Sequence, residues 1–444
     1  MPDCAGWRRT TLILSGDDPR VIEQILDLHI HSRYSRACSK ELVLPAIAAA
    51  CETRGIDIVS TGDWTHPAWF AHMEAELAED APGIYALKHH VSRTRFIIGT
   101  EIASIKKHAG ATRRVHHLVF APTLAAARKA NDALAARGYN IRSDGRPIIG
   151  MTSRDLLEFF LGIDERMAMI PAHAWTPWFG VFGSKGGYDS LDECFEDLTP
   201  HIRAIETGLS SDPAMNRRCG FLDGITLISN SDAHSPQKLG REANVMRFGD
   251  KREISYDEIM RIIREGDAKK FIETLEFYPE EGKYHMDGHA DCAFFCTPEE
   301  TKKYGGRCPK CKKQITVGVM NRVAALADRD DRQARAAGKI PFRSLVPLPE
   351  IIADALEIGV ATKAVRTAYD ALIRACGNEF RILRTASIDE IAGASSPMIA
   401  EAVRRVREGR IAIRPGYDGV FGVVKVFEEG EGRGRAKQSL LDLE

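Results

Sequence analysis

Short apolar runs rich in β-branched residues alternate with helical or loop segments through the first 235 residues of the chain. The runs lie at 27–31, 56–61, 96–100, 115–120, 167–172, 202–205 and 225–231. Such alternation is typical of parallel strands joined by crossover segments in an α/β protein. A helix is expected over 40–54, with Gly55 ending it. The pattern predicts a distorted barrel of seven β/α repeats.

Most of these runs end in side chains that bind metals. The residues are His29 and His31, Asp63 with His66 nearby, Glu101, the pair His116 and His117, His173, Glu206, and Asp232 with His234. The carboxyl ends of the strands converge at the active site of a closed α/β barrel. Any one of these side chains is more often a surface or capping residue. Their recurrence after successive strands predicts a shared metal site.

The His29-x-His31 pair opens this series. Alternation along a strand turns both imidazoles to one face, with Cα atoms about 7 Å apart at a rise of ~3.3 Å per residue. The pair alone is weak evidence, because two histidines on a strand face are commonly surface residues.

Imidazole and carboxylate ligands together suit Zn, Mn or Fe better than an all-oxygen site does. The number of candidate ligands is enough for two or three ions. One ion would lower the pKa of a bound water while a neighbour neutralised charge on the leaving oxygen. The expected chemistry is therefore hydrolysis by a multinuclear metal centre, with Zn, Mn or Mg as the divalent ions.

A glycine-rich segment, 180–188, follows Trp175 and Trp178. It lacks the Gly-Lys-Ser/Thr order of a Walker loop, so we interpret it as a flexible lid. Tryptophans after ligand-bearing strands are most often core residues, but near a metal site they could stack on an unpaired nucleotide.

A second metal site is predicted around Cys308-x-x-Cys311. Glycines before this pair and a proline within it are typical of a zinc knuckle. Upstream, His289 with Cys292 and Cys292 with Cys296 are competing pairs, and the two-residue gap favours His289. A redox role for Cys308 and Cys311 is disfavoured because no apolar helix follows them. We expect a structural zinc ion that fixes a small module with little core of its own.

Positive charge is concentrated beside this module. Residues 301–350 hold 12 Lys and Arg against 4 Asp and Glu, in a chain whose formal net charge is −1. Six basic residues surround the predicted zinc site: Lys302, Lys303, Arg307, Lys310, Lys312 and Lys313. A rigid zinc module with a cationic rim can hold a phosphate backbone.

The chain has 444 residues, ten of them cysteines. Its N-terminal apolar stretch is too short for a secretory signal, so the cysteines point to a reducing compartment. No apolar run approaches the ~20 residues that cross a bilayer. We expect a soluble, cytoplasmic protein with no membrane partner.

The strand-end residues over roughly the first 250 positions resemble the polymerase and histidinol phosphatase (PHP) family of metallophosphoesterases. The resemblance implies the ligand set His29, His31, Asp63, Glu101, His117, His173, Asp232 and His234. Many members have a further histidine where this chain has Ala37, so one ion would be lost or held differently. Asp63 stands apart from the usual Asp-His pair, which leaves open whether His66 also binds.

Further segments make nearly the whole chain similar to the endonuclease Q family. They are His31-Ser-Arg-Tyr-Ser-Arg-Ala37, Glu206-Thr-Gly-Leu-Ser-Ser-Asp-Pro213, the zinc module at 284–311, and 318–328. Members cut DNA on the 5′ side of uracil, hypoxanthine, xanthine or an abasic site. The resemblance implies that Asp232 is a ligand central to cleavage, and the predicted catalytic residues are Asp232, His234 and Glu101. It also implies that the zinc module and the helical tail grip duplex DNA.

Five segments follow from these patterns. They are an irregular lead-in (1–24), a PHP barrel (25–280), a zinc-binding module (281–345), a helical DNA-binding domain (346–428) and a disordered tail (429–444). Prolines at 341, 347 and 349 mark the linker before the helical domain, in which two short helices are expected over 387–407.

We predict a metal-dependent endonuclease that flips a damaged base toward the loops at 32–36, 175–178 and 210–211, a displacement that costs least for damaged or mispaired bases. The predicted DNA contacts are Ser32, Arg33, Arg36, Trp175, Ser210 and Lys312. The expected partner is double-stranded DNA carrying deaminated bases, with a sliding clamp as a further candidate. The alternatives are a phosphatase for a small phosphomonoester, a DNA exonuclease and a non-catalytic zinc adaptor.

Overall fold

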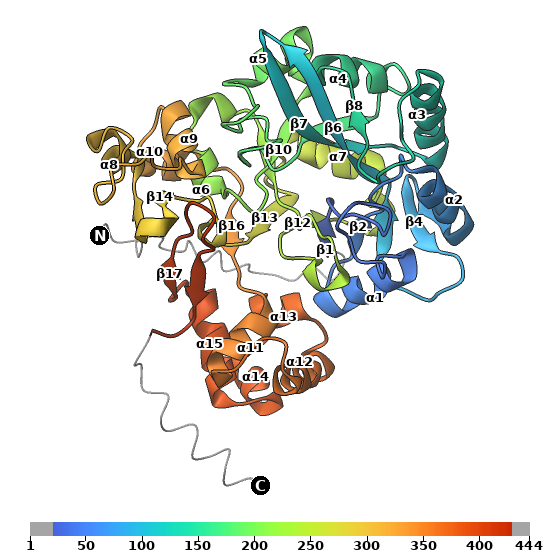
Figure 1. Cartoon of the computed structure of the whole chain (residues 1–444). Coiled ribbons are helices and arrows are strands. Elements are labelled where there is room, and N and C mark those ends of the chain that lie inside the picture. The colour runs from blue at the N-terminus through green and yellow to red at the C-terminus, as the bar shows by residue number, and fades with distance from the viewer. Residues whose placement is uncertain (1–20, 429–444) are drawn as a thin grey trace.

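The structure is a computed structural model that describes residues 21–428. Figure 1 shows an α/β body, a small module containing β14 and α8 beside it, and a helical region that holds α11 to α15. The predicted tail and the first 20 residues of the predicted lead-in lie outside the described residues.

The largest sheet contains eight strands in the order β16-β13-β12-β1-β2-β5-β4-β3. Their bounds are β1 Ile22–Asp27, β2 Ile58–Ser60, β3 Leu77–Ala81, β4 Ile84–Leu87, β5 Arg95–Ile97, β12 Ala243–Phe248, β13 Phe271–Glu276 and β16 Phe342–Ser344. The β1–β2 and β2–β5 pairs are parallel, as predicted, whereas β12 runs antiparallel to β1. The irregular segment predicted for 1–24 is wrong at its end, because residues 22–24 pair with β12.

A four-stranded sheet has the order β8-β6-β7-β9. Its strands are β6 Gly99–His108, β7 Ala111–Phe120, β8 Ile148–Ile149 and β9 Ala168–Pro171. Only Ala109 and Gly110 connect β6 to β7, and so short a connection allows only an antiparallel pair. β9 also runs antiparallel to β7. The mixed α/β class is confirmed, but the uniformly parallel arrangement predicted for these strands is wrong.

Three two-stranded sheets complete the described strands. They are β10 Ala204–Glu206 with β11 Thr226–Ile228, β14 Asp287–His289 with β15 Phe294–Cys296, and β17 Ala412–Arg414 with β18 Val423–Lys425. β10 and β11 are parallel, so their carboxyl ends lie at the same edge.

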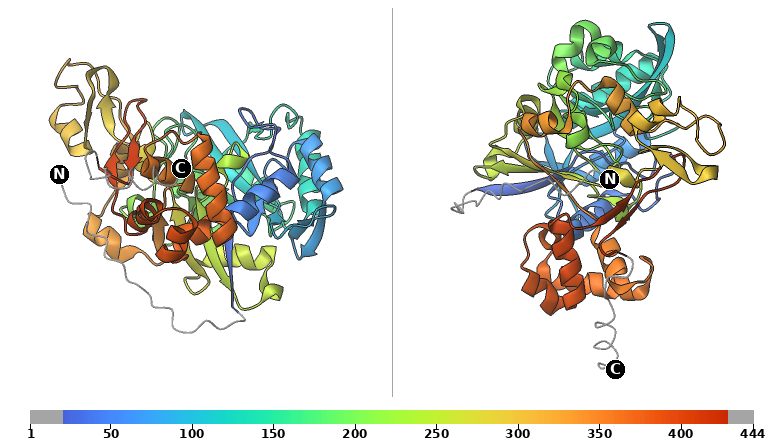
Figure 2. Two further views of the ribbon diagram at one scale, coloured as in Figure 1. Left: turned by 90° about the horizontal axis from the view of Figure 1, so that it is seen from below. Right: turned by 90° about the vertical axis from the view of Figure 1, so that its left-hand side faces the viewer.

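Helices flank the body and form the C-terminal region (Figure 2). In the body and the module they are α1 Leu44–Arg54, α2 Pro67–Glu76, α3 Leu124–Ala136, α4 Ser153–Leu161, α5 Leu191–Phe195, α6 Pro213–Asn216, α7 Tyr256–Glu265, α8 Pro298–Lys303, α9 Val319–Leu326 and α10 Asp331–Ala337. In the C-terminal region they are α11 Leu348–Leu356, α12 Lys363–Cys376, α13 Glu379–Arg384, α14 Ile388–Ala394 and α15 Pro397–Arg407. Gly55 ends α1 as predicted, with a left-handed φ of 90° and its N–H bonded to the Cys51 carbonyl.

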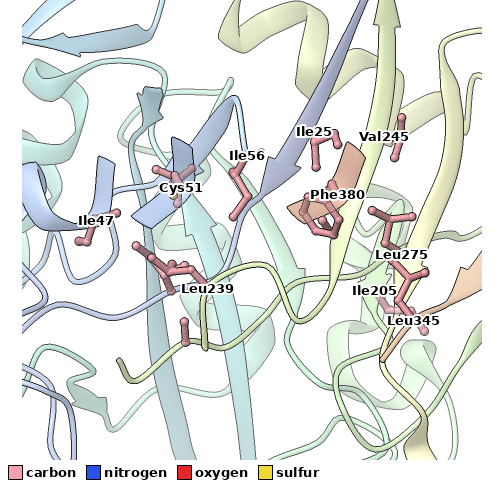
Figure 3. Close-up of a cluster of buried hydrophobic side chains, with 14 of the residues drawn as sticks. Ile25, Ile47, Cys51, Ile56, Ile205, Leu239, Val245, Leu275, Leu345 and Phe380 are labelled. Atoms are coloured by element: carbon pink, nitrogen blue, oxygen red, sulfur yellow. The ribbon is translucent and has the colours of Figure 1, made fainter. Parts of the chain in front are cut away.

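One hydrophobic core runs from the body into the helical region. Phe380 of α13 belongs to the same buried cluster as Ile25 of β1 and Val245 of β12 (Figure 3). Ion pairs border this contact: Arg384 bonds Glu273 at 2.9 Å and Glu23 at 2.7 Å. The helical region is therefore packed against the large sheet.

The module differs from the predicted segment 281–345 at its C-terminal limit and in what packs against it. β16 pairs with β13 in the large sheet, so residues 342–344 belong to the body. The hairpin of β17 and β18, from the far end of the chain, returns to the module, where the Met286 N–H donates to the Gly416 carbonyl at 2.9 Å. Long-range backbone pairing of this kind has no local signature in sequence.

Candidate active site

Five of the ligands predicted for the body lie close together: His29, His31, Glu101, His173 and Asp232. His29 and His31 follow β1 rather than extending it, because the strand ends at Asp27. Ile30 between them still bridges Ala233, which follows Asp232. The two imidazole ring centres lie 5.4 Å apart. The histidine pair therefore converges as predicted, although it lies beyond the regular strand.

A first ligand group consists of His29, His31, Glu101 and Asp232, whose ligand atoms all lie within 4.8 Å of one another. His31 Nε2 lies 3.0 Å from Asp232 Oδ1 and 3.3 Å from Glu101 Oε2. His29 Nε2 lies 3.5 Å from Asp232 Oδ1. All four side chains point into one small volume.

A second ligand group shares Glu101 and adds His116 and His173. Glu101 Oε1 lies 2.5 Å from His116 Nδ1 and 3.0 Å from His173 Nε2. The other oxygen, Oε2, faces the histidines of the first group. One carboxylate thus faces both groups and could serve ions held by either of them.

Buried carboxylates orient the first two histidines. The Nδ1–H of His29 donates to both oxygens of Glu206 at 3.0 Å, and the Nδ1–H of His31 donates to Asp63 Oδ1 at 3.1 Å. Each hydrogen bond leaves Nε2 directed at the ligand group. A carboxylate behind a histidine is the usual way to fix the tautomer of a metal ligand.

Glu206 also organises the second group. Its carboxylate accepts the backbone N–H of His173 at 2.7 Å and an Nδ2–H of Asn230 at 2.8 Å. It is fully buried, and it is absent from the predicted set of site residues even though the strand-end pattern includes it.

The two acidic ligands are held in their charged form. Burial alone would raise the pKa of Asp232, but His29 and His31 outweigh it and lower that pKa. Burial likewise acts against ionisation of Glu101, yet His116, Arg146 and His173 hold its pKa well below the usual range. Ionised carboxylates are the form that binds cations.

Left-handed backbone occurs at three site residues: Asp63 with φ 46°, His173 with φ 30° and Asp232 with φ 47°. Non-glycine residues in this region carry strain and cluster at functional sites. Next to His173, Gly208 has no room for a side chain, since a Cβ would lie 2.5 Å from the His173 Cβ. These turns redirect the chain after each strand so that its side chain faces the site.

The donor atoms fit divalent metal ions. His29 Nε2, which faces Glu101 and Asp232, is buried and has no hydrogen-bond partner among the described residues. Imidazole nitrogens combined with two carboxylates match the preferences of Zn or Mn, and accommodate Mg less well. Buried unpaired nitrogens carry a cost that a bound ion would remove.

A pocket of about 710 Å³ opens beside the two ligand groups. His116, His173 and Asp232 form part of its wall, and the other lining residues include Arg36, Arg146, Trp178, Phe179 and Ser210. The ligand groups are thus reachable from solvent through a space large enough for a nucleotide.

Arg146 is a site residue that the sequence analysis missed. Its Nη1 lies 3.0 Å from Glu101 Oε2, and its side chain is 27% exposed toward the pocket. It lies in an irregular segment before β8, and nothing in the local pattern distinguishes it from other surface arginines.

Three predicted ligands lie outside both groups. His117 points away, with Nε2 2.9 Å from Ser153 Oγ, because neighbouring strand residues face opposite sides. The expectation for His117 is wrong, and His116 takes its position. Asp63 orients His31, and its other oxygen accepts the Ser32 N–H at 2.7 Å. His234 lies beside His31, with ring centres 4.6 Å apart, and its Nδ1 lies 2.8 Å from the Asp232 carbonyl.

The open question about His66 has a clear structural answer. Its Nε2 lies 3.0 Å from the Arg142 carbonyl, and its ring stacks on Tyr34 at 4.5 Å. It therefore supports the loop around 140–146 and lies outside both ligand groups.

The predicted DNA contacts divide by exposure. Arg33, Arg36 and Lys312 are exposed, and Ser210 lines the pocket. Ser32 and Trp175 are fully buried. Ser32 binds Asp63, and the indole N–H of Trp175 donates to Asn216 Oδ1 at 2.7 Å. Direct contact with DNA by Ser32 or Trp175 is therefore excluded in this arrangement, and Trp178, 44% exposed, is the tryptophan at the pocket.

The small module brings together His289, Cys292, Cys308 and Cys311, with ligand atoms within 4.8 Å of one another. This is the set that the sequence analysis favoured. Cys296 instead lies with Thr301, its Sγ 3.2 Å from Oγ1. Around the four ligands only Cys296, Cys308 and Ile315 form a small buried cluster, so the module has little core of its own.

The basic residues around this module lie at its surface. Lys302, Lys303, Arg307, Lys310, Lys312 and Lys313 are all exposed. Within residues 21–428, no helix is both long and apolar enough to cross a membrane.

Comparison with known families matches residues 347–410 to the MJ0043 C-terminal domain. The chain is 33% identical over 256 residues to "Uncharacterized protein MJ0043" of Methanocaldococcus jannaschii, covering 57% of this chain and 31% of that protein. It is 28% identical over 422 residues to "Uncharacterized protein YqxK" of Bacillus subtilis, covering 90% of this chain and 98% of that protein. The chain thus spans under a third of the first relative and nearly all of the second.

Two solved structures are similar over nearly the whole chain. The lesion-specific endonuclease PfuEndoQ from Pyrococcus furiosus is 31% identical, with a TM-score of 0.80, covering 94% of this chain and 99% of that one. An endonuclease Q complex with a 27-mer duplex that carries an abasic lesion at the active site is 32% identical, with a TM-score of 0.77, covering 92% and 98%.

Proposed function

The chain belongs to the endonuclease Q family, and we propose that it is a DNA-repair endonuclease that hydrolyses the phosphodiester 5′ to uracil, hypoxanthine, xanthine or an abasic site. The observation that carries this proposal is the pair of ligand groups sharing Glu101 beside the 710 Å³ pocket. A related enzyme holds a duplex with an abasic lesion at its active site, which supports DNA as the partner.

Divalent ions would be held by His29, His31, Glu101 and Asp232 in one group and by Glu101, His116 and His173 in the other. When bound, such ions supply a water of lowered pKa and neutralise charge on the leaving oxygen. Zn, Mn or Mg would serve, with the imidazole-rich set favouring Zn or Mn.

The side chains behind these ligands keep the arrangement rigid. Glu206 and Asp63 hold His29 and His31 in one tautomer, so their Nε2 atoms need no reorganisation when substrate arrives. The left-handed turn at Asp232 keeps its carboxylate at the pocket wall.

Two residues beside the ligand groups, Arg146 and His234, could act on the phosphodiester of a bound DNA strand. The Arg146 guanidinium lies at the pocket and carries a fixed positive charge, which would attract a phosphodiester and stabilise charge that develops on it. The His234 Nδ1–H donates to the Asp232 carbonyl at 2.8 Å, so its Nε2 is free to accept a proton. That nitrogen would hold the proton near the reacting phosphate.

DNA would be gripped by the module and the helical region. The exposed lysines and arginines around the four Cys and His ligands, which we assign to structural zinc, would contact phosphates on the duplex. The pocket would receive the extruded nucleotide. No feature of residues 21–428 points to a sliding clamp as a further partner.

The test is a nicking assay with the full-length chain and Mg²⁺ or Mn²⁺. The substrates are duplexes with a single deoxyuridine, deoxyinosine or abasic site, and the control is an undamaged duplex of identical sequence. We expect one nick on the 5′ side of each lesion and none in the control.

Two other outcomes would overturn the proposal. Release of phosphate from p-nitrophenyl phosphate without nicking would identify a phosphatase for small monoesters. A ladder of products shortened from the DNA ends would identify an exonuclease.

A further inference from the structure

Three aromatic side chains from distant parts of the chain form a surface that leads away from the pocket. We call Trp178, Tyr284 and Phe421, with Lys283 between the last two, the aromatic strip. The Trp178 ring lies edge-on to Tyr284, with centroids 5.6 Å apart. Lys283 Nζ lies 5.5 Å from the Tyr284 ring and 5.8 Å from the Phe421 ring.

The backbone fixes the strip in place. The loop that carries Phe421 bonds to the segment before Tyr284: the Gly419 N–H donates to the Lys283 carbonyl at 2.9 Å, and the Gly422 N–H donates to the Glu281 carbonyl at 3.1 Å. The Tyr284 carbonyl accepts the Val319 N–H at 2.8 Å. Body, module and C-terminal hairpin therefore present these rings together.

Large aromatic side chains are usually buried, but two rings of the aromatic strip are exposed to solvent. Phe421 is 69% exposed and Trp178 is 44% exposed. Trp178 also lines the pocket, so the strip is continuous with the space beside the ligand groups. Lys283 is exposed between the rings and gives the surface a positive charge.

We propose that the aromatic strip stacks on bases left unpaired when the lesion nucleotide is extruded. This inference rests on the proposed function. Extrusion leaves the base opposite the lesion unpaired and removes a stacking partner from the bases next to the lesion. The exposed faces of these bases can then stack on protein side chains. Aromatic rings next to a cation bind unpaired bases of any sequence through stacking, while the cation meets the backbone. The same enzyme could then accept several lesions, because the strip contacts the intact bases around them.

The experiment measures binding and base environment in the Asp232→Asn background, where cutting is blocked. Duplexes carry one abasic site and 2-aminopurine opposite it or one position away. We expect binding to quench the 2-aminopurine through stacking. Phe421→Ala and Phe421→Leu should reduce that quenching and weaken binding to lesion duplexes by about 10-fold. Phe421→Trp should restore both.

Phe421 is the decisive position because it lies outside the pocket and is exposed, so its substitution should leave the fold intact. Trp178→Ala should have the same effect on quenching. Val91→Ala, at an exposed position on the β4–β5 connection, is the control and should change neither measurement.

Unchanged quenching and affinity in the Phe421 and Trp178 variants would overturn this inference. That is also the result expected if the strip binds a protein and not DNA. If the variants bind unchanged but the wild-type chain nicks lesion duplexes, only the role of the aromatic strip is wrong and the proposed function is retained. If the wild-type chain does not nick lesion duplexes, the proposed function itself is wrong.

Discussion

The Glu206 carboxylate accepts the Nδ1–H of His29 with both of its oxygens, each at 3.0 Å, inside a fully buried site. The bond directs His29 Nε2 toward Asp232 and Glu101. Glu206 also holds the His173 backbone, so one side chain behind the ligands orients a member of each group.

Glu206→Gln should weaken metal binding by about 10- to 100-fold, because an amide holds the His29 tautomer less firmly than a carboxylate. Metal content after dialysis against buffers of increasing metal concentration checks this. Activity should return at high metal concentration. The exposed Glu165→Gln is the matched control and should retain its metal. Equal metal affinity in Glu206→Gln and the control would show that the bond has no role in metal binding.

His116→Ala should lose one metal ion and at least about 100-fold in nicking rate, because His116 belongs to the second ligand group. His117→Ala should retain its metals and its nicking rate within a few-fold. The cost of His117→Ala should be a lower melting temperature, since the side chain is fully buried. Nicking and melting measured on both variants check the assignment, and the opposite pattern would return the ligand to His117.

The sequence can bring candidate ligands together where a ligand follows its strand or has close neighbours in the chain. Glu101, His173 and Asp232 lie together in the structure, as expected from strand ends that converge. The group around Cys308 and Cys311 also lies together, as expected from its local spacing.

Side-chain direction could not be predicted from sequence where it depends on strand register or loop conformation. The choice between His116 and His117 follows from the pairing of β6, β7 and β9, which no local pattern encodes. The left-handed turn at Asp63 directs its carboxylate at His31, so this predicted ligand orients a histidine and lies outside both ligand groups. Trp175 and Trp178 are three residues apart, yet one is buried and the other exposed.

Cys308→Ser should remove one equivalent of zinc, unfold the module and weaken binding to duplex DNA. The module has little core to replace the metal. Hydrolysis of a small phosphodiester, bis-p-nitrophenyl phosphate, should be unchanged, because the module is not part of either ligand group in the body. Cys296→Ser is the matched control and should keep its zinc, and loss of zinc there would move the ligand to Cys296.

Stability should fall as the pH rises from 4.5 to about 7, in part because of Glu276. Burial raises the pKa of this carboxyl from 4.5 to about 7, so within that window the folded state keeps a proton that the unfolded state releases. The contribution is on the order of 3 kcal/mol and levels off above the folded pKa. Glu276→Gln should flatten this dependence.

Melting curves of the wild type, Glu276→Gln and Glu165→Gln between pH 5 and 8 check this. The gain in melting temperature of Glu276→Gln over the wild type should increase with pH, and Glu165→Gln should follow the wild type. A constant difference between Glu276→Gln and the wild type across this range would contradict the prediction.

We propose that the two ligand groups sharing Glu101, with Asp232 in one of them, cut DNA at a lesion. Single-turnover nicking of a deoxyuridine duplex by the wild type and by Asp232→Asn, with binding to the same duplex measured in parallel, tests it most directly. We predict that Asp232→Asn binds the duplex within a few-fold of the wild type and does not nick it. Nicking by Asp232→Asn at the wild-type rate would show that this group of residues does not cut the DNA.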